Sequence, residues 1–248
     1  MSAVYILWLR QLKRYYRARS RIIGSLGQPL LFLLALGFGF GPVFQAAGRG
    51  NYLEFLTPGV IAMAVLFTAV FSGIEIIWDK QFGFLKETLV APVSRLQIMV
   101  GRTLGGATVA AVQGIIVLVI GTLVGFRMQS LHMLPLALLF MALIALLFTA
   151  LGTAIASVLE DFQGFQLIMN FLVMPLFFLS GAIFPLAGLP VALIIVASLD
   201  PLSYGVDGLR WALTGAFVFS PQVDFLVLAI ATSVLLAIGS YLFSRVQV

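Results

Sequence analysis

The residues that most often carry enzyme or metal chemistry are scarce in this chain. There is no cysteine, and the single histidine, His132, falls in a short predicted loop. A metal site built on histidine or cysteine needs several such ligands, so the sequence predicts none. The nearest approach to a phosphate-binding loop is the stretch GRTLGG at 101–106, which lacks the Gly-Lys-Ser/Thr ending that holds the phosphates. We therefore expect that the chain does not hydrolyse ATP by itself.

One dipeptide keeps a hydrolase open as an alternative. Ser180-Gly181 is the pair that carries the nucleophile in intramembrane serine proteases, but position 178 is Phe where that motif has its first Gly. A serine nucleophile needs a base within hydrogen-bonding reach, and the only candidate, His132, is predicted to lie outside the hydrocarbon.

The clearest functional pattern lies in the segment that follows residue 78. Gly83 and Pro92 bracket about two helical turns, because both residue types mark helix ends. Apolar side chains stand beside charged ones here, outside any apolar span: Phe82, Phe84, Leu85 and Leu89 with Lys86 and Glu87. Exposed aromatic residues on a short rigid helix are typical of a docking surface, and the alternative is a loop that only packs against the membrane surface.

The apolar composition of the chain indicates that the helices on either side of this segment are surrounded by lipid. Of 248 residues, 62% are hydrophobic and 9% are charged, whereas soluble domains are about 45–50% apolar and about 25% charged. A span of about 30 Å of hydrocarbon takes about 20 apolar residues in a helix. Six segments have this length, which predicts an all-α integral membrane protein with spans at about 25–45, 55–78, 98–126, 134–158, 162–184 and 223–244.

The basic residues predict the orientation of the spans, because cytoplasmic loops carry an excess of Lys and Arg. With the N-terminus inside, the outer side receives only Arg49, Arg127 and Arg210, and the inner side receives eleven basic residues. Both termini are therefore expected in the cytoplasm. Basic residues that flank apolar spans indicate contact with membrane lipids and argue against nucleic acid. Almost no charge falls at mid-span, which argues against a carrier driven by an ion gradient.

The first 24 residues form a separate predicted element, an amphipathic helix in the membrane interface. One of its faces carries five basic residues: Arg10, Lys13, Arg14, Arg17 and Arg21. A second face is apolar: Tyr5, Leu9, Leu12 and Tyr16. The helix is either a simple lipid anchor or an element that also touches a cytoplasmic partner, and the sequence leaves the two open.

The stretch 186–199 is apolar but too short for a span, with Pro185 and Pro190 near one end and Asp200-Pro201 at the other. This pattern favours a re-entrant or interfacial helical pair, and the alternative is a seventh span that would place the C-terminus outside.

Aromatic side chains mark a candidate pathway. Its predicted lining is Phe67, Phe71, Asn170, Phe171, Phe177 and Phe178, and ordinary packing is the alternative for each ring. Pairs of glycines four residues apart, among them Gly101 and Gly105, predict close contact between helices.

Two stretches resemble one known family. WDKQFGFLKETLVAPVSR at 78–95, and FLSGAIFPLAGLP with LDPLSYGVDGLR between 178 and 210, are similar to segments of type-2 ABC exporter permeases, the family of daunorubicin-resistance and nodulation-factor export permeases. The resemblance extends over essentially the whole chain. It implies residues 1–24 as a connecting helix, residues 25–248 as a six-span domain, and an external re-entrant pair before the last span.

The resemblance also implies a mechanism. Two permease copies, or this chain and a close relative, would pair around a pathway and seat coupling helices on two cytoplasmic ABC ATPase subunits. ATP and Mg would bind the ATPase, and this chain would bind no cofactor. The implied contact residues are Phe82, Gly83, Phe84, Leu85, Lys86, Glu87, Leu89, Pro92 and Arg95.

The leading hypothesis is the permease of an exporter in the cell membrane, which moves a hydrophobic drug, a lipid-like molecule or a lipid-linked saccharide outward. An ATP-independent channel or secondary carrier is the second hypothesis, and an intramembrane hydrolase is the third.

Overall fold

The computed structural model describes residues 3–48, 50–84 and 93–244, and every regular element within those ranges is helical. Lipid offers no partner for backbone N–H and C=O groups, so each apolar segment must pair them internally. The elements are α1 (Ala3–Arg17), α2 (Arg19–Leu31), the π-helical turn η1 (Phe32–Leu36), α3 (Gly37–Ala46), α4 (Tyr52–Phe71), α5 (Ile74–Gln81), α7 (Arg95–Val124), η2 (Leu131–Met133), α8 (Leu134–Val158), α9 (Phe162–Ile168), the π-helical turn η3 (Met169–Val173), α10 (Met174–Leu179), α11 (Val191–Leu199), α12 (Pro201–Thr214) and α13 (Pro221–Ser244).

Within the described residues, six continuous helical runs are long and apolar enough to cross a membrane, as predicted. They are Ile22–Ala46, Tyr52–Gln81, Arg95–Val124, Leu131–Val158, Phe162–Leu179 and Pro221–Ser244. The fifth run ends at Leu179, so the prediction that it continues to 184 is wrong. Gly181 has a φ of +73°, which an L side chain rarely adopts, and the Ser180 hydroxyl donates to the Phe177 carbonyl oxygen. These features end the helix and turn the chain, although the following residues in the sequence are still apolar.

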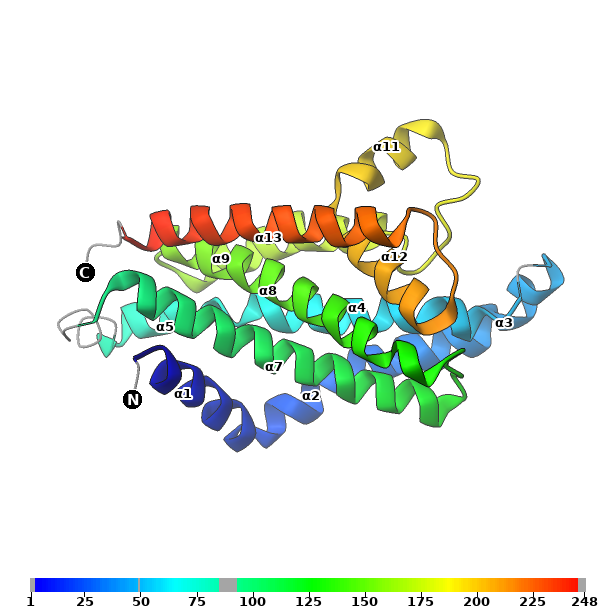
Figure 1. Ribbon diagram of the computed structural model, residues 1–248. Helices are drawn as coiled ribbons and strands as arrows, with labels where there is room; N and C mark the ends of the chain where they lie inside the picture. Colours follow the sequence, from blue (N-terminus) through cyan, green and yellow to red (C-terminus); the bar gives the residue numbers. More distant parts are fainter. Residues whose placement is uncertain (1–2, 49, 85–92, 245–248) are drawn as a thin grey trace.

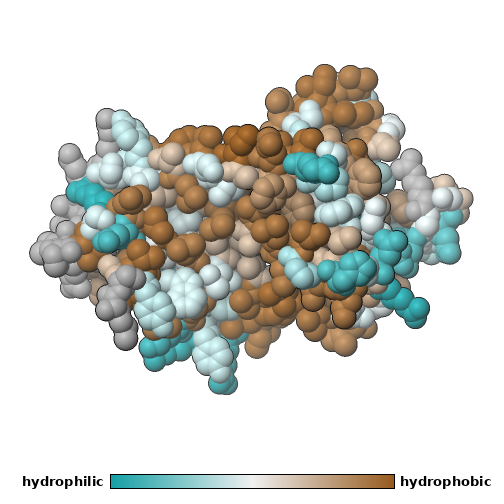
Figure 2. All heavy atoms as spheres, viewed as in Figure 1, coloured by the Kyte–Doolittle hydropathy of each residue, from teal (hydrophilic) through white to brown (hydrophobic). Residues whose placement is uncertain are grey.

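The spans lie side by side, and Ala3 and Ser244 sit at the same end of the bundle, which we call the terminal end (Figure 1). The span that contains α4 is central, with 78% of its most apolar window buried, against 17% for the first and last spans. Apolar side chains cover the middle of the molecule in Figure 2, and hydrophilic ones gather toward its ends. The first and last spans therefore provide much of the surface that faces lipid or another chain.

Close packing at the centre depends on glycine. A methyl group added at Gly152 of α8 would lie 2.4 Å from the carbonyl oxygen of Val70 in α4. One added at Gly73 would lie 2.3 Å from the carbonyl oxygen of Gly152. The two backbones are therefore in direct contact, which only residues without a Cβ permit.

The stretch before the last span forms a bent helical pair. α11 and α12 meet at Asp200 and are bent by 88°. The Asp200 carboxylate accepts from the Leu202 backbone N–H at 2.8 Å, and Pro201 occupies the first position of α12, where its missing N–H costs nothing. The helical part begins at Val191 and extends to Thr214, later than the predicted stretch 186–199.

Candidate functional site

The N-terminal helix packs lengthwise on α7. A methyl group at Gly101 would lie 2.9 Å from the Leu7 Cβ, so the missing side chain is what lets α1 approach. The Trp8 indole N–H donates to the Thr108 hydroxyl at 3.0 Å, and the Tyr15 hydroxyl donates to the Gln113 Oε1 atom at 2.7 Å. Since Gln113 lies well inside the span, α1 is not confined to the plane of the membrane surface.

α1 packs on α7 with a different face from the apolar face predicted for the membrane interface. Tyr16 is 76% exposed and Tyr5 is also exposed, while Val4, Leu7 and Gln11 contact α7. The glycines and polar groups of α7 decide which face packs, and a helical projection of α1 alone does not contain them. α1 ends at Arg17 and α2 begins at Arg19, so the predicted segment 1–24 also includes the first turns of α2.

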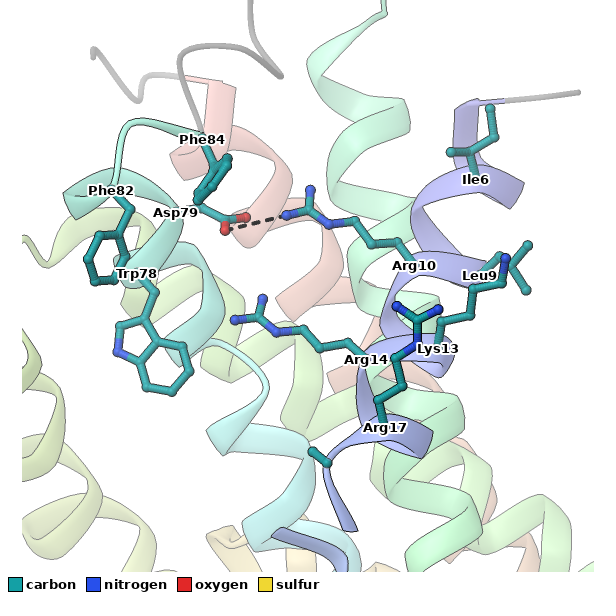
Figure 3. Close-up of a pocket in the computed structure, with 11 residues that line it drawn as sticks. Ile6, Leu9, Arg10, Lys13, Arg14, Arg17, Trp78, Asp79, Phe82 and Phe84 are labelled. Atoms are coloured by element: carbon teal, nitrogen blue, oxygen red, sulfur yellow. Dashed lines mark ion pairs between the residues drawn. The ribbon is translucent and has the colours of Figure 1, made fainter. Parts of the chain in front are cut away.

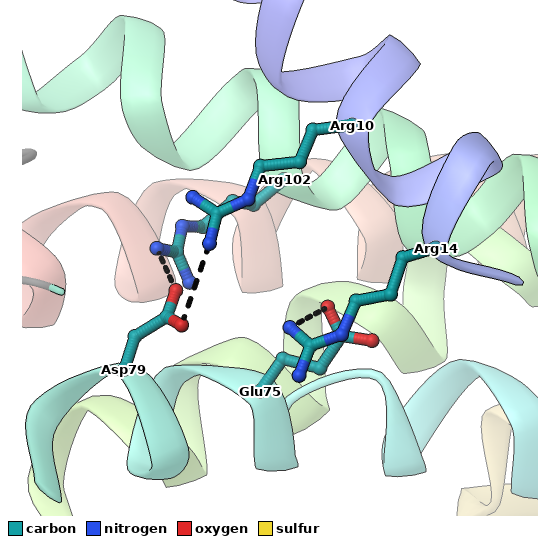
Figure 4. A network of polar contacts seen from close by, with 5 residues as sticks. All are labelled: Arg10, Arg14, Glu75, Asp79 and Arg102. Carbon is teal, nitrogen blue, oxygen red and sulfur yellow. Dashed lines mark hydrogen bonds and ion pairs between the residues drawn. The ribbon is translucent and has the colours of Figure 1, made fainter. Parts of the chain in front are cut away.

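Three basic residues from α1 and α7 meet two carboxylates on α5 at the terminal end (Figure 4). Asp79 is 4% exposed and Arg102 is 5% exposed, and the Arg102 guanidinium donates to the Asp79 carboxylate. Arg10 lies 3.7 Å from the other Asp79 oxygen, and Arg14 lies 3.5 Å from the buried Glu75 carboxylate. Residues four apart share one helix face, so the pair 10 and 14 on α1 matches the pair 75 and 79 on α5. We call these five residues the charge network.

A fourth basic residue holds α5 from its other side. The Lys80 ammonium donates to the carbonyl oxygens of Ala156 at 3.1 Å, Ser157 at 2.8 Å and Leu159 at 3.1 Å. These carbonyls end α8, and a cation at a helix C-terminus satisfies acceptors that have no partner within the helix. α5 is therefore fixed to α1, α7 and α8 directly before the predicted docking segment.

Part of the predicted docking segment is described. Phe82 is 73% exposed and Phe84 is 50% exposed, and Gly83 between them has a φ of +80°. Arg95 donates to the Ser244 carbonyl oxygen. Ser94 and Gln97 form a capping box that starts α7. The remaining predicted contact residues, Leu85, Lys86, Glu87, Leu89 and Pro92, lie outside the described residues.

A groove of about 860 Å³ opens between α1 and α5 (Figure 3). Its α1 wall carries four of the five basic residues predicted for this face: Arg10, Lys13, Arg14 and Arg17. The side chain of the fifth, Arg21, is not among those described. The opposite wall carries Trp78, Phe82 and Phe84, and the Arg14 guanidinium lies 5.7 Å from the centre of the Trp78 ring.

The predicted pathway residues differ in their exposure. Phe67 and Phe71 line a second cavity of about 220 Å³ between α2 and α4. Phe177 is buried and packs edge-on against Phe67 at 6.1 Å between ring centres. Asn170, Phe171 and Phe178 are exposed on η3 and α10, with Phe171 80% exposed.

Arg210 was predicted only to lie on the outer side and was given no further role, but it is buried at the far end. Its guanidinium donates to the Gly181 carbonyl oxygen at 2.9 Å and lies 4.1 Å from the centre of the Phe55 ring. Asp207, one turn earlier, accepts from the Phe219 backbone N–H at 2.7 Å. These contacts fasten the bent pair to the bundle.

The residues considered for a hydrolase do not meet. The Ser180 hydroxyl is buried and donates to a backbone carbonyl, and the ring of His132 bonds the Ser130 hydroxyl. Among the described residues, no His, Cys, Asp and Glu side chains group so that they could hold a metal ion.

Comparison with known proteins decides the family. The family profile described as ABC-2 type transporter matches residues 2–214. The chain belongs to the ABC-2 type transporter family. This assignment confirms the resemblance found in the sequence. The ABC-2 permease is a multi-pass membrane protein that forms the transmembrane part of an ABC transporter, and its family lacks an ATPase domain. A permease of this kind implies a separate ATPase subunit as its partner.

Several named relatives match over most of their length. The putative transport permease ycf38 of Cyanophora paradoxa is 26% identical over 262 residues, which cover 99% of this chain and 89% of that protein. Nodulation protein J of Rhizobium leguminosarum bv. trifolii is 29% identical over 224 residues, covering 89% and 80%. The probable doxorubicin resistance ABC transporter permease protein DrrC of Mycobacterium tuberculosis is 27% identical over 241 residues, covering 93% and 85%.

Proposed function

We propose that the ABC-2 permease exports an amphipathic or hydrophobic molecule and receives mechanical work from ATPase subunits docked at its terminal end. The observation that carries this proposal is the way α5 is held. Its buried Asp79 and its Lys80 fasten it to α1, α7 and α8, directly before the exposed Phe82 and Phe84. A lever transmits displacement only if its base is rigid, and interlocked helices provide such a base.

The terminal end is the cytoplasmic end in this proposal. Eleven basic residues were assigned to that side by the sequence, against three on the other. The bent pair α11–α12 would then be a re-entrant element on the outer face. The ATPase, which binds ATP and Mg, would contact the segment 82–95 and the exposed side of α1.

A second permease copy, either identical or closely related, would complete the pathway, with one ATPase for each copy. The relative named for doxorubicin resistance supports an exported cargo of drug-like, apolar character. The apolar span surfaces support the same class, because they offer few polar groups for a hydrophilic cargo.

Replacement of Phe84 tests the docking surface. Phe84→Ala should reduce the amount of ATPase that co-purifies with the tagged permease by about tenfold, because aromatic anchors dominate such interfaces. Glu87→Gln should weaken the same association. Phe38→Ala is the matched control, since Phe38 is also exposed, at 62% against 50% for Phe84, but lies on α3, away from the terminal end. Unchanged ATPase recovery from both Phe84→Ala and Glu87→Gln would remove this segment from the docking surface.

A further inference from the structure

We propose that a pocket between α10 and α11, at the far end of the bundle, binds an organic amine in its protonated form, with Asp200 as the counter-ion. The pocket has a volume of about 280 Å³. It lies away from α1 and α5, whose end of the bundle the proposed function assigns to the ATPase (Figure 1). The inference goes beyond the proposed function, because the site needs neither the ATPase nor a direction of transport.

Asp200 supplies a buried carboxylate with an unused acceptor. The residue is 3% exposed and lines the pocket at the corner between α11 and α12. One carboxylate oxygen, Oδ1, accepts from the Leu202 backbone N–H at 2.8 Å. The other, Oδ2, is also buried and accepts from no described group. A buried carboxylate that is only partly paired is costly, so a cationic donor at Oδ2 would be favourable.

The described cations of the chain are not placed to supply that donor. The elements η3, α10 and α11 contain no ionisable residue, and α12 contains Tyr204, Asp207 and Arg210. The Tyr204 hydroxyl donates to the Ser198 carbonyl oxygen at 2.8 Å, while Asp207 and Arg210 make the contacts described above. A cation that pairs with Asp200 must therefore come from outside the described part of the chain.

The walls of the pocket favour an organic cation over a metal ion. Apolar side chains of η3, α10 and α11 form them, among them Phe171, Leu172, Leu176, Val196 and Leu199. A metal ion needs several oxygen or nitrogen ligands, and Asp200 is the only charged side chain among the described lining residues. The apolar body of an amine would instead be buried against these walls. The Phe171 ring, which is 80% exposed, offers its face to the ammonium group.

The protonation of Asp200 controls the pairing. Asp200 lies between the two helices of the bent pair, outside the six spans. Burial raises the pKa of its carboxyl to about 7, and the hydrogen bond from the Leu202 N–H opposes that rise. Only the ionised carboxylate attracts an ammonium group, so binding of the amine should strengthen as the pH rises through this value.

Binding of a small amine tests the site. The probe is 4-phenylbutylamine, titrated against the full-length permease in zwitterionic nanodiscs without an ATPase, and 4-phenylbutan-1-ol is its uncharged counterpart. The amine should bind about tenfold more tightly than the alcohol at pH 8, because only the amine pairs with the carboxylate. Asp200→Asn should remove this difference, since asparagine keeps an oxygen for the Leu202 N–H but carries no charge.

The pH dependence gives a second readout. The amine stays charged between pH 6 and pH 8, so it should bind the wild type about tenfold more weakly at pH 6, where the Asp200 carboxyl is mostly protonated. Asp200→Asn should lose this dependence. A bound amine should also slow the hydrogen exchange of the α11 amides, and slowing confined to other helices would overturn the proposal.

Asp161→Asn is the matched control, because Asp161 also caps a helix, α9, but is exposed and does not line the pocket. An equal loss of amine binding with this variant would indicate general charge attraction and overturn the proposal. Phe171→Ala changes an exposed side chain and should weaken amine binding even if Asp200→Asn proves unstable. Equal binding of amine and alcohol by the wild type, or no binding because a second permease copy covers the pocket, would overturn the proposal and leave the proposed function intact.

Discussion

At the scale of single residues, the pair Asp79 and Arg102 is the strongest constraint on the terminal end. Both side chains are almost fully buried, so each ion has lost most of its solvation and depends on the other. A buried pair of this kind adds little net stability compared with apolar residues, but its separation leaves an uncompensated charge. Its main effect is to fix how α5 lies against α7, and hence where Phe82 and Phe84 are presented.

A double-mutant cycle measures this dependence. Asp79→Asn should lower the free energy of unfolding by about 3–5 kcal/mol, because it leaves the buried Arg102 guanidinium unpaired. Arg102→Gln should lower it by less, because Arg10 still lies 3.7 Å from the Asp79 carboxylate. The double variant should lose less than the sum of the two, since it leaves no charge behind. Thermal unfolding of the permease in detergent gives the comparison. Strictly additive losses would contradict a direct interaction between the two side chains.

The sequence contained one signal for this network that went unused. Arg10 and Arg14 are four residues apart, and so are Glu75 and Asp79, which is the spacing of one helix face. Which faces meet could not be derived, because Asp79 and Arg102 are 23 residues apart and belong to different helices. Pairing across helices depends on their packing, which the pattern within each helix does not contain.

At the scale of elements, the attachment of α1 to α7 determines the groove. The two helices touch where Gly101 and Gly105 leave room, and two hydrogen bonds fix their register. The basic face of α1 is then turned toward α5. The basic face and the glycine pair were predictable from the sequence, whereas the face of α1 that packs on α7 was not, because the matching surface lies on another helix.

A bulky residue at the contact should release α1. Gly101→Leu should raise the hydrogen-exchange rates of the α1 amides by at least tenfold, because the side chain would collide with the Val4 backbone and Leu7. Gly27→Leu is the control, since a Cβ there meets nothing within 4 Å. Equal exchange in the two variants would show that α1 is held by contacts other than this one.

The six spans were predictable to within a few residues at most ends, and the reason is physical. Span length is set by the bilayer, and apolar composition is a local property of the sequence. The fifth span was the exception, because Ser180 and Gly181 end it through hydrogen bonds and backbone geometry while the apolar run continues. A helical pair was predicted before the last span, but Asp200, predicted to close it, is instead the corner between α11 and α12.

At the scale of the whole molecule, the permease has two different ends. The terminal end holds the charge network, the groove and the exposed phenylalanines, and the far end holds the bent pair with its buried Arg210 and Asp207. The proposed coupling through α5 requires that the terminal end receives the ATPase. Phe82 and Phe217 are both exposed phenylalanines outside the described helices, one at each end, and they make a matched pair of probes.

Photocrosslinking from these two positions is the most direct test. A photoreactive amino acid at position 82 should crosslink the permease to its co-expressed ATPase in intact cells, and the same amino acid at position 217 should not. A crosslink from position 217 with none from position 82 would contradict the orientation, the docking surface and the transfer of work through α5.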